Sequence, residues 1–512
     1  MTLKQKQDRY EMHKYWGKKP SANLKTVIEK YTKETDVVFE PFSGYGVFSC
    51  EAYLLNRNVI ANDINPISNF VVSRLLSKNF NENKLRKLWK EVKANIQNFI
   101  DYWYRVNLDG KEVKIISILR DEENKPIKIK CEVLKEKKTI MVNLKEEEIE
   151  SFIKFEDENE VEDWFPDVEI IENTRISAKK GLRVADLFTK RSLACHAKLF
   201  KLIDELPSCE EKELLKLAFT ANIANCSKLV PPIKVRGEMS QGAWQTGFYI
   251  GKTYIENNVL DYFENRLEKV IKGKKDFLSQ LDKSNDNFYQ ITNFDAKKMM
   301  VDNETVDYVF ADPPYGDAVP YLEQSVIWNA WLKLHPKYEE EIVVSNSKVR
   351  KKDMNNFEKD IEKAFSEIKR VLKKEGYFSL TYHSISGLEW RVITNACVKN
   401  GFKIIDFEWL TQKTFTPRQL NRKKTIKGDV LITFKKADNY EEKFLNIEQT
   451  EQFFKENIKK LLKNNNLDVN IIFLKIMELI FKKRVIVEKV DLYKILEKNF
   501  YLNADNKWGL SG

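Results

Sequence analysis

Cysteine is scarce in this sequence, and its few copies are scattered. The 512 residues contain no C-x-x-C pair and no cysteine–histidine group at metal-ligand spacing; the six cysteines are Cys50, Cys131, Cys195, Cys209, Cys226 and Cys397. Zinc sites need clustered ligands of that kind. We therefore expect reduced, mostly buried thiols and no bound metal.

Long apolar runs are also missing. No stretch approaches the roughly 18–20 apolar residues of a membrane span, and the opening MTLKQKQDRYEMHKYW lacks the apolar segment of a secretory signal. We expect a cytoplasmic protein with no membrane partner. The phosphate-binding pattern G-x-x-x-x-G-K-[ST] and the third glycine of the dinucleotide fingerprint are absent too, which disfavours ATP and NAD.

The residues that are present indicate a folded protein of more than one unit. Hydrophobic residues make up 42% and aromatic residues 12% of the chain, too much apolar material for a disordered protein. Its length exceeds what one hydrophobic core usually supports. The 87 Lys and Arg against 77 Asp and Glu give a net charge of +10, which suits a polyanionic partner without proving one.

Hydrophobic patterning predicts an α/β fold with a doubly wound sheet of about seven strands. Strand and helix alternate at 37–76 and again from 288, whereas the part between contains long helices and three alternating segments, at 111–119, 128–134 and 138–144, that suggest a small antiparallel sheet. The predicted units are therefore 1–77 and 288–438 as two parts of one core, 78–287 as a mixed α/β insertion, and 439–512 as a separate helical C-terminal domain.

The tetrapeptide Asp312-Pro313-Pro314-Tyr315 directly follows the apolar strand VDYVFA. An aromatic exocyclic amine is a poor nucleophile, because its lone pair is delocalised into the ring. A carboxylate from Asp312 and a carbonyl from Pro313 can accept its two N–H bonds and direct the lone pair at an electrophile. The prolines fix the backbone, and Tyr315 offers a face on which a flipped base can stack.

A second motif follows the first strand of the pattern. Phe42-Ser43-Gly44-Tyr45-Gly46 places two glycines between a strand and a helix, where the backbone can approach a ligand closely. Asn62-Asp63 ends the next strand, a position from which an acidic residue can hold ribose hydroxyls. Glu40 ends the first strand and can accept a hydrogen bond from an amino group.

These two motifs resemble the cofactor and catalytic motifs of the amino-methylating DNA methyltransferases, which make N6-methyladenine or N4-methylcytosine. The resemblance covers roughly residues 9–75 and 288–436. It implies a Rossmann-like core that depends on S-adenosylmethionine. Segments between 165 and 330, such as ADLFTKR and TANIANCSK, are similar to a group of bacterial adenine-specific DNA methylases.

The resemblance also assigns residues to the cofactor. The segment from His13 to Pro20 resembles the family's motif before the cofactor loop, and Asp295-Ala296 resembles the acidic motif of the third strand. The cofactor-binding residues predicted in this way and from the strand ends are His13, Lys19, Pro20, Glu40, Pro41, Phe42, Ser43, Gly44, Gly46, Asn62, Asp63, Asp295 and Ala296.

We therefore predict methyl transfer to adenine N6 in duplex DNA with the target base flipped out. The resemblance implies a setting in restriction–modification or phage defence, with a restriction or defence protein as partner. Methylation at C5 of cytosine is excluded, because it needs a cysteine nucleophile and no Pro-Cys pair occurs. The alternatives are N4-cytosine methylation, an RNA methyltransferase acting on guanine N2 or adenine N6, and a non-catalytic DNA-binding subunit.

Nucleic-acid contacts are expected mainly in loops of the insertion. Asn, Gln and Arg can read base edges, and Lys and Arg can meet phosphates. A polar loop on a basic protein is an equally good explanation for any one of them. The candidates are Asn222, Asn225, Lys228, Arg236, Trp244, Gln245 and Lys348, with the run 418–424 as a further option.

Overall fold

A seven-stranded sheet forms the centre of the molecule. The computed structural model describes residues 7–316, 319–382, 389–410, 429–437 and 441–510. The strands of the sheet are β1 (Val37–Glu40), β2 (Asn58–Asn62), β8 (Tyr289–Thr292), β9 (Val306–Ala311), β10 (Leu372–Tyr382), β11 (Phe402–Leu410) and β12 (Asp429–Lys436). The predicted α/β sheet of about seven strands is confirmed.

The strand order is β11-β12-β10-β9-β1-β2-β8. Five strands, from β10 to β8 in this order, run parallel, whereas β12 runs antiparallel to both β10 and β11. Strands β2 and β8 follow β1 on one side of the sheet, whereas β10, β12 and β11 lie beyond β9 on the other side. The strand order therefore reverses between β1 and β9, where open sheets of this kind bind ligands.

Helices cover both faces of the sheet, because residues along the central strands alternate in direction. Val38 and Tyr308 join one hydrophobic cluster, and their neighbours Phe39 and Val309 join another. The first cluster includes α1 (Ser21–Tyr31), α2 (Val47–Leu54) and α3 (Pro66–Leu76); the second includes α11 (Met354–Val371) and α12 (Glu389–Lys399).

Residues between α3 and β8 form a helical layer and a second sheet. The sheet has the order β3-β4-β5-β6, with β7 paired to β4, and all its pairs are antiparallel. It contains the three segments predicted from alternation, and adds β3 and β7. The bounds are α4 (Glu82–Tyr104), β3 (Arg105–Leu108), β4 (Lys111–Asp121), β5 (Pro126–Val133), β6 (Lys138–Asn143), α5 (Glu146–Glu158), α6 (Lys190–Asp204), α7 (Glu210–Ile223), β7 (Thr253–Asn257) and α8 (Val259–Gln280).

The C-terminal residues are helical and pack directly on the core. Asn395 on α12 donates to Val487 O at 2.8 Å and accepts from Val487 N at 3.0 Å. Apolar side chains of this region belong to the same cluster as α11 and α12, so it shares their core rather than forming a separate one. Its elements are β13 (Lys443–Phe444), α14 (Ile447–Leu462), α15 (Val469–Lys483), β14 (Val485–Ile486), α16 (Leu492–Asn499), β15 (Tyr501–Leu502) and β16 (Trp508–Gly509).

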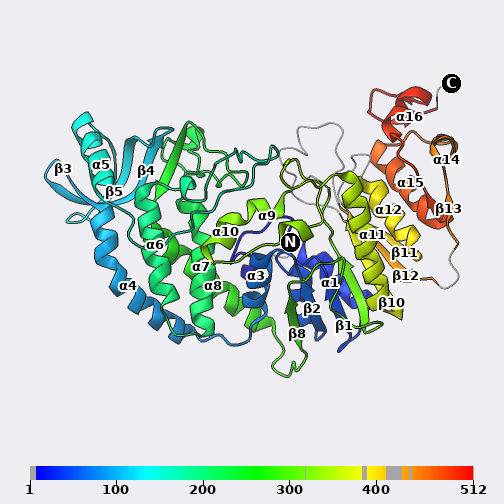
Figure 1. Cartoon of the computed structure of the whole chain (residues 1–512), viewed down its shortest axis with the longest axis horizontal. Coiled ribbons are helices and arrows are strands. Elements are labelled where there is room, and N and C mark those ends of the chain that lie inside the picture. The colour runs from blue at the N-terminus through cyan, green and yellow to red at the C-terminus, as the bar shows by residue number, and fades with distance from the viewer. Residues whose placement is uncertain (1–6, 317–318, 383–388, 411–428, 438–440, 511–512) are drawn as a thin grey trace.

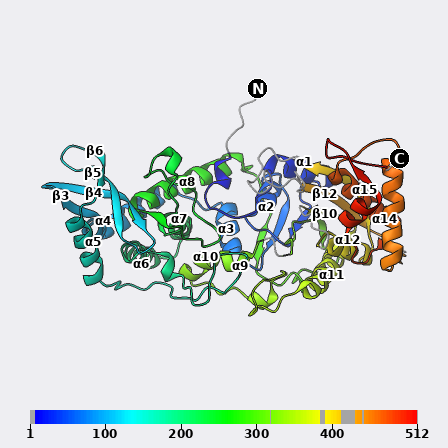
Figure 2. The same ribbon diagram turned by 90° about the horizontal axis from the view of Figure 1, so that it is seen from above.

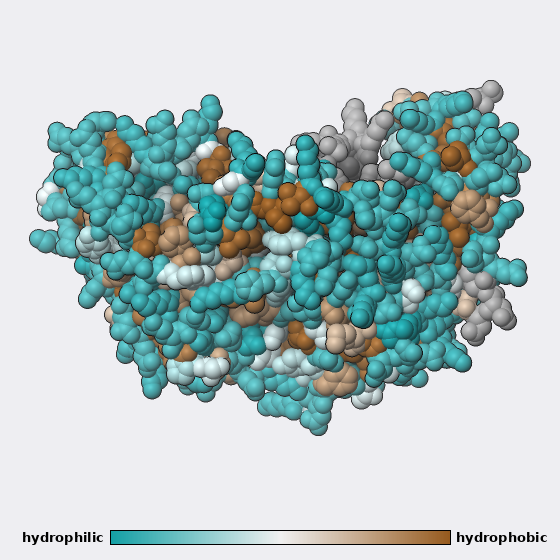
Figure 3. All heavy atoms as spheres, in the orientation of Figure 1, coloured by the Kyte–Doolittle hydropathy of each residue, from teal (hydrophilic) through white to brown (hydrophobic). Residues whose placement is uncertain are grey.

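The molecule is elongated, with the second sheet at one end, the C-terminal helices at the other and the large sheet between them (Figures 1 and 2). Two short helices, α9 (Tyr321–Gln324) and α10 (Val326–Trp331), lie near its middle (Figure 1). The space-filling view shows a largely hydrophilic face whose upper edge is hollowed above α9 (Figure 3). Among the described residues, no helix has both the length and the apolar character to span a bilayer.

Candidate active site

A cleft enclosing about 920 Å³, part of it open to solvent, lies at the carboxyl ends of β1, β2 and β9. It is therefore located where the strand order reverses. Its lining includes eleven residues predicted from the sequence: Lys19, Glu40, Pro41, Phe42, Ser43, Gly44, Asn62, Asp63, Ala296, Asp312 and Pro314. Segments far apart in the chain meet here because parallel strands end at one edge of a sheet.

The glycine turn after β1 has the backbone conformation that its glycines allow. Gly44 and Gly46 have φ of 51° and 78°, in the region that favours glycine. A Cβ atom on Gly46 would lie 2.7 Å from Val72 Cγ2, so α2 can begin here only because this side chain is missing. The turn is thus held close to α3, and Ser43 and Gly44 face the cleft.

Asn62 and Asp63 connect the loops around the cleft. The side-chain amide of Asn62 donates to Pro41 O at 3.2 Å and to Phe294 O at 3.0 Å. Its Oδ1 accepts from Phe294 N at 2.9 Å. The Asp63 carboxylate accepts from Gly44 N at 2.7 Å and from Asn65 N at 2.9 Å. Burial raises the pKa of the Asp63 carboxyl. Both side chains therefore shape the cleft that they line.

Glu40 lies buried at the end of β1. Its carboxylate accepts from Ser49 N at 3.0 Å and from the Ser49 hydroxyl at 2.5 Å. Burial raises the pKa of this carboxyl to about 8, against the opposing effect of the Ser49 hydrogen bonds. Glu40 can therefore carry a proton near neutral pH and either donate or accept a hydrogen bond in the cleft.

Asp312 follows β9 and is oriented by its neighbours. Its Oδ1 accepts hydrogen bonds from the Thr381 hydroxyl of β10 at 2.7 Å and from the Tyr315 hydroxyl. Its Oδ2 pairs with Lys19 Nζ at 3.1 Å. The carboxylate is thus held at the cleft wall by contacts from three segments, with Pro314 also lining the wall.

Several predicted residues lie beside the cleft rather than in its lining. Gly46 and Pro20 are the N-cap residues of α2 and α1, and Asp295 pairs with Lys297 at 3.1 Å. Pro313 and Tyr315 are likewise not among the lining residues. The prediction is wrong for His13: its ring is buried edge-on against Trp328, its Nδ1 lies 2.7 Å from Lys14 O, and it does not line the cleft. Burial lowers the pKa of His13 to about 3, so it stays neutral and structural.

The cleft also contains residues that no motif indicated. Trp16 and Tyr321 line it with rings 6.2 Å apart, and Asn65 donates to Tyr15 Oη at 3.1 Å and to Ser325 Oγ at 2.9 Å. Glu341 also lines it; burial, with a smaller contribution from Glu323, raises the pKa of this carboxyl to about 7. Trp16 lies within the motif-like segment 13–20 and Tyr321 within the stretch 165–330 that the resemblance covers, whereas Glu341 had no signal in the sequence.

The predicted nucleic-acid residues divide by exposure. Asn222 is fully buried and donates to Val259 O at 3.2 Å, and Trp244 is buried against Trp328 with Lys14 over its ring. The prediction is wrong for these two, because their side chains are used inside the protein. Arg236, Gln245 and Lys348 are exposed, whereas Asn225 and Lys228 are half-buried. The run 418–424 lies outside the described residues.

Residues 2–68 match the model of the N6_N4_Mtase family, described as DNA methylase, which supports the resemblance over that segment. The matched segment contains the glycine turn and Asn62-Asp63 and ends before the insertion. The search of curated proteins found no significant match.

Among solved structures, a TehB-like SAM-dependent methyltransferase from Corynebacterium glutamicum is 10% identical, with 33% of this chain and 63% of that one covered and a TM-score of 0.15. Geranyl diphosphate C-methyltransferase from Streptomyces coelicolor, in complex with S-adenosyl-L-homocysteine, is 10% identical over 35% of this chain and 60% of that one, with a TM-score of 0.18. The chain thus spans less than two thirds of the length of both. A phosphoethanolamine N-methyltransferase from Haemonchus contortus is 10% identical, with coverage of 82% and 100% and a TM-score of 0.18.

Proposed function

We propose that this protein transfers a methyl group from S-adenosylmethionine to the N6 amine of adenine in duplex DNA. The observation that carries the proposal is that Asp312 and residues 42–45 of the glycine turn line the same cleft. The partial match to the DNA methylase family supports it independently, since it rests on residues 2–68 and not on Asp312.

The residues of the cleft fit the cofactor. Ser43 Oγ and Trp16 Nε1 are buried polar atoms without a partner in the described structure, and both residues line the cleft. Phe42, Phe294 and Ile342 supply an apolar lining for an adenine ring, whereas Asp63 and Glu40 supply carboxyl groups for hydroxyl and amino groups. The bound cofactor would supply an electrophilic methyl group on a sulfonium.

In this reaction the protein positions the target amine and forms no covalent bond to it. Asp312 is held by Thr381 so that its carboxylate can accept from the target amine, and Pro313 would offer its carbonyl as the second acceptor. With both N–H bonds engaged, the lone pair of the nitrogen leaves conjugation with the ring. The proton released after transfer passes to Asp312 or to solvent.

The nucleic acid would meet the exposed basic and polar residues Arg236, Gln245 and Lys348. A net charge of +10 and the hollowed edge of the molecule in Figure 3 suit a polyanion. Within this proposal the protein belongs to a restriction–modification or phage-defence system and acts with a partner protein of that system.

The test is methyl transfer from labelled S-adenosylmethionine to unmodified duplex DNA and to RNA, followed by mass spectrometry of the released nucleosides. We expect N6-methyladenine in DNA that disappears in Asp312→Ala and persists in the matched control Asp302→Ala, an exposed carboxylate before β9. N4-methylcytosine, or label in RNA, would replace the proposed substrate by an alternative one. Cofactor binding without transfer would indicate a non-catalytic subunit.

A further inference from the structure

Lys19 lines the cleft beside Asp312. Its ammonium pairs with Asp312 Oδ2 at 3.1 Å, and the two side chains are only 10% and 20% exposed. The segment that carries it also touches the glycine turn: Lys18 Nζ lies 3.6 Å from the centroid of the Tyr45 ring, and a Cβ on Gly44 would lie 3.1 Å from Tyr15 Cε1. Lys19 therefore contacts Asp312 from a segment that packs against the glycine turn.

The contact with Lys19 occupies the carboxylate that the proposed reaction needs. Oδ1 of Asp312 already accepts from Thr381 and Tyr315, so Oδ2 is the oxygen on which a target amine would bind. Lys19 holds that oxygen in this structure. A cation on this oxygen therefore competes with the target amine for it.

The glycine turn offers few donors to an anion. The backbone N–H groups of Ser43, Gly44 and Gly46 already donate to Asn62 O, Asp63 Oδ2 and Ser43 O at 2.8, 2.7 and 2.6 Å. The Ser43 hydroxyl, buried and without a partner in the described structure, remains. Of the two lysines that line the cleft, Lys18 is held by Tyr10 O at 2.6 Å and His13 O at 2.7 Å.

We propose that Lys19 is a positioning residue that blocks Asp312 until the cofactor is bound. The α-carboxylate of the cofactor replaces Asp312 as the partner of the Lys19 ammonium, with the Ser43 hydroxyl as its second donor. The exchange keeps one carboxylate on the lysine, so its ammonium does not lose its counter-ion. Asp312 Oδ2 then becomes available to the target amine, and the cofactor must bind before the base. This inference rests on the proposed function.

The first test compares two probes that differ only in the carboxylate, S-adenosylhomocysteine and its decarboxylated analogue. In Lys19→Met, we expect the Kd of S-adenosylhomocysteine to rise at least about tenfold, the loss of a charge-assisted hydrogen bond. The Kd of the decarboxylated analogue should change less than about threefold. Lys19→Arg keeps the charge and should restore most of the difference, whereas Lys25→Met, on the exposed side of α1, should change neither.

The second test asks whether the Lys19–Asp312 contact is lost when the cofactor binds. A thermal-unfolding cycle of the full chain, with Lys19→Met, Asp312→Asn and both together, measures the coupling between the two side chains. We expect a coupling in the apoprotein that disappears with saturating S-adenosylhomocysteine.

A coupling that persists with ligand, or an equal loss of affinity for both probes in Lys19→Met, would overturn the inference while leaving the proposed function intact. Failure of the unmodified protein to bind either probe would instead overturn both. Lys19→Gln removes the charge but keeps a polar end, so it repeats the affinity comparison if Lys19→Met folds poorly.

Discussion

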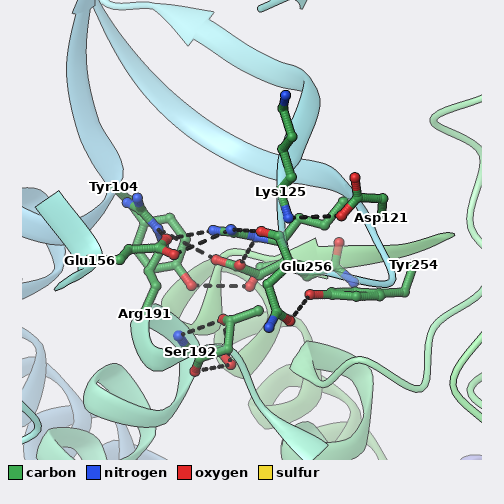
Figure 4. Close-up of polar contacts among 12 residues, drawn as sticks. Tyr104, Asp121, Lys125, Glu156, Arg191, Ser192, Tyr254 and Glu256 are labelled. Atoms are coloured by element: carbon green, nitrogen blue, oxygen red, sulfur yellow. Dashed lines mark hydrogen bonds and ion pairs between the residues drawn. The ribbon is translucent and has the colours of Figure 1, made fainter. Parts of the chain in front are cut away.

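Arg120 donates from Nε to Glu256 Oε2 at 2.6 Å, and both side chains are buried inside the insertion. Glu256 also pairs with Arg191 at 3.6 Å, and Glu156 accepts from Arg191 at 3.1 Å (Figure 4). Glu156 pairs with Arg120 as well. Two arginines and two glutamates thus balance their charges where water is excluded. The network joins β4, β7, α5 and α6, four elements that are distant in sequence.

Breaking this network should be costly. Glu256→Gln leaves Arg120 buried with half of its ion pairs, and we expect a loss of about 3–5 kcal/mol in the free energy of unfolding. Chemical denaturation followed by tryptophan fluorescence measures it. The control is Lys111→Met, which removes an exposed pair with Glu136 and should leave the free energy of unfolding nearly unchanged. Equal losses in the two variants would contradict the structural role of the network.

The raised pKa of the Glu40 carboxyl makes the stability of the fold depend on pH. Its pKa is raised to about 8 from an ordinary value of 4.5, so the folded protein binds more protons than the unfolded chain between these values. The contribution of Glu40 to the free energy of unfolding is fully present below about pH 4.5 and is lost as the pH rises through 8. The Tm of the unmodified protein should therefore fall between pH 5 and pH 9 relative to that of Glu40→Gln. A constant difference in Tm would show that the carboxyl titrates normally.

Gly46 should tolerate no side chain. Gly46→Ala combines a φ of 78° with a Cβ 2.7 Å from Val72 Cγ2, and we expect a loss of about 2–4 kcal/mol in unfolding free energy. Gly110→Ala is the matched control, since Gly110 has φ of 77° and no atom within 4 Å of the added Cβ. It should lose only about 1 kcal/mol. Combining Gly46→Ala with Val72→Ala should recover part of the steric cost; no recovery would place the clash elsewhere.

Thr381 should act through the orientation of Asp312. Thr381→Val removes the 2.7 Å hydrogen bond to Asp312 Oδ1 and keeps the shape of the side chain. Within the proposed function, we expect kcat to fall about 10–100-fold. The Kd of S-adenosylhomocysteine should stay unchanged, because Thr381 does not line the cleft. Thr381→Ser should restore kcat, and a parallel loss of cofactor affinity would show instead that the whole site is disturbed.

Local pattern was enough to locate the two motifs and the strands that carry them. Apolar runs followed by Gly44 or Asp312 mark strand ends, and the alternation at 111–144 marks a half-buried antiparallel sheet, because both signals arise within a few residues. Their meeting in one cleft also followed, since parallel strands end at the same edge of a sheet.

Contacts between distant segments were decided only by the tertiary structure. The burial of Asn222 and His13, the arrival of Tyr321 and Glu341 in the cleft, and the packing of the C-terminal helices on α12 all depend on which surfaces meet. The pairing of Lys19 with Asp312, 293 positions further along (312 − 19), is of the same kind. The sequence by itself determined the elements and the chemical groups at their ends. Packing decided which of those groups face the cleft, because the residues next to a side chain in sequence do not specify which distant segment will cover it.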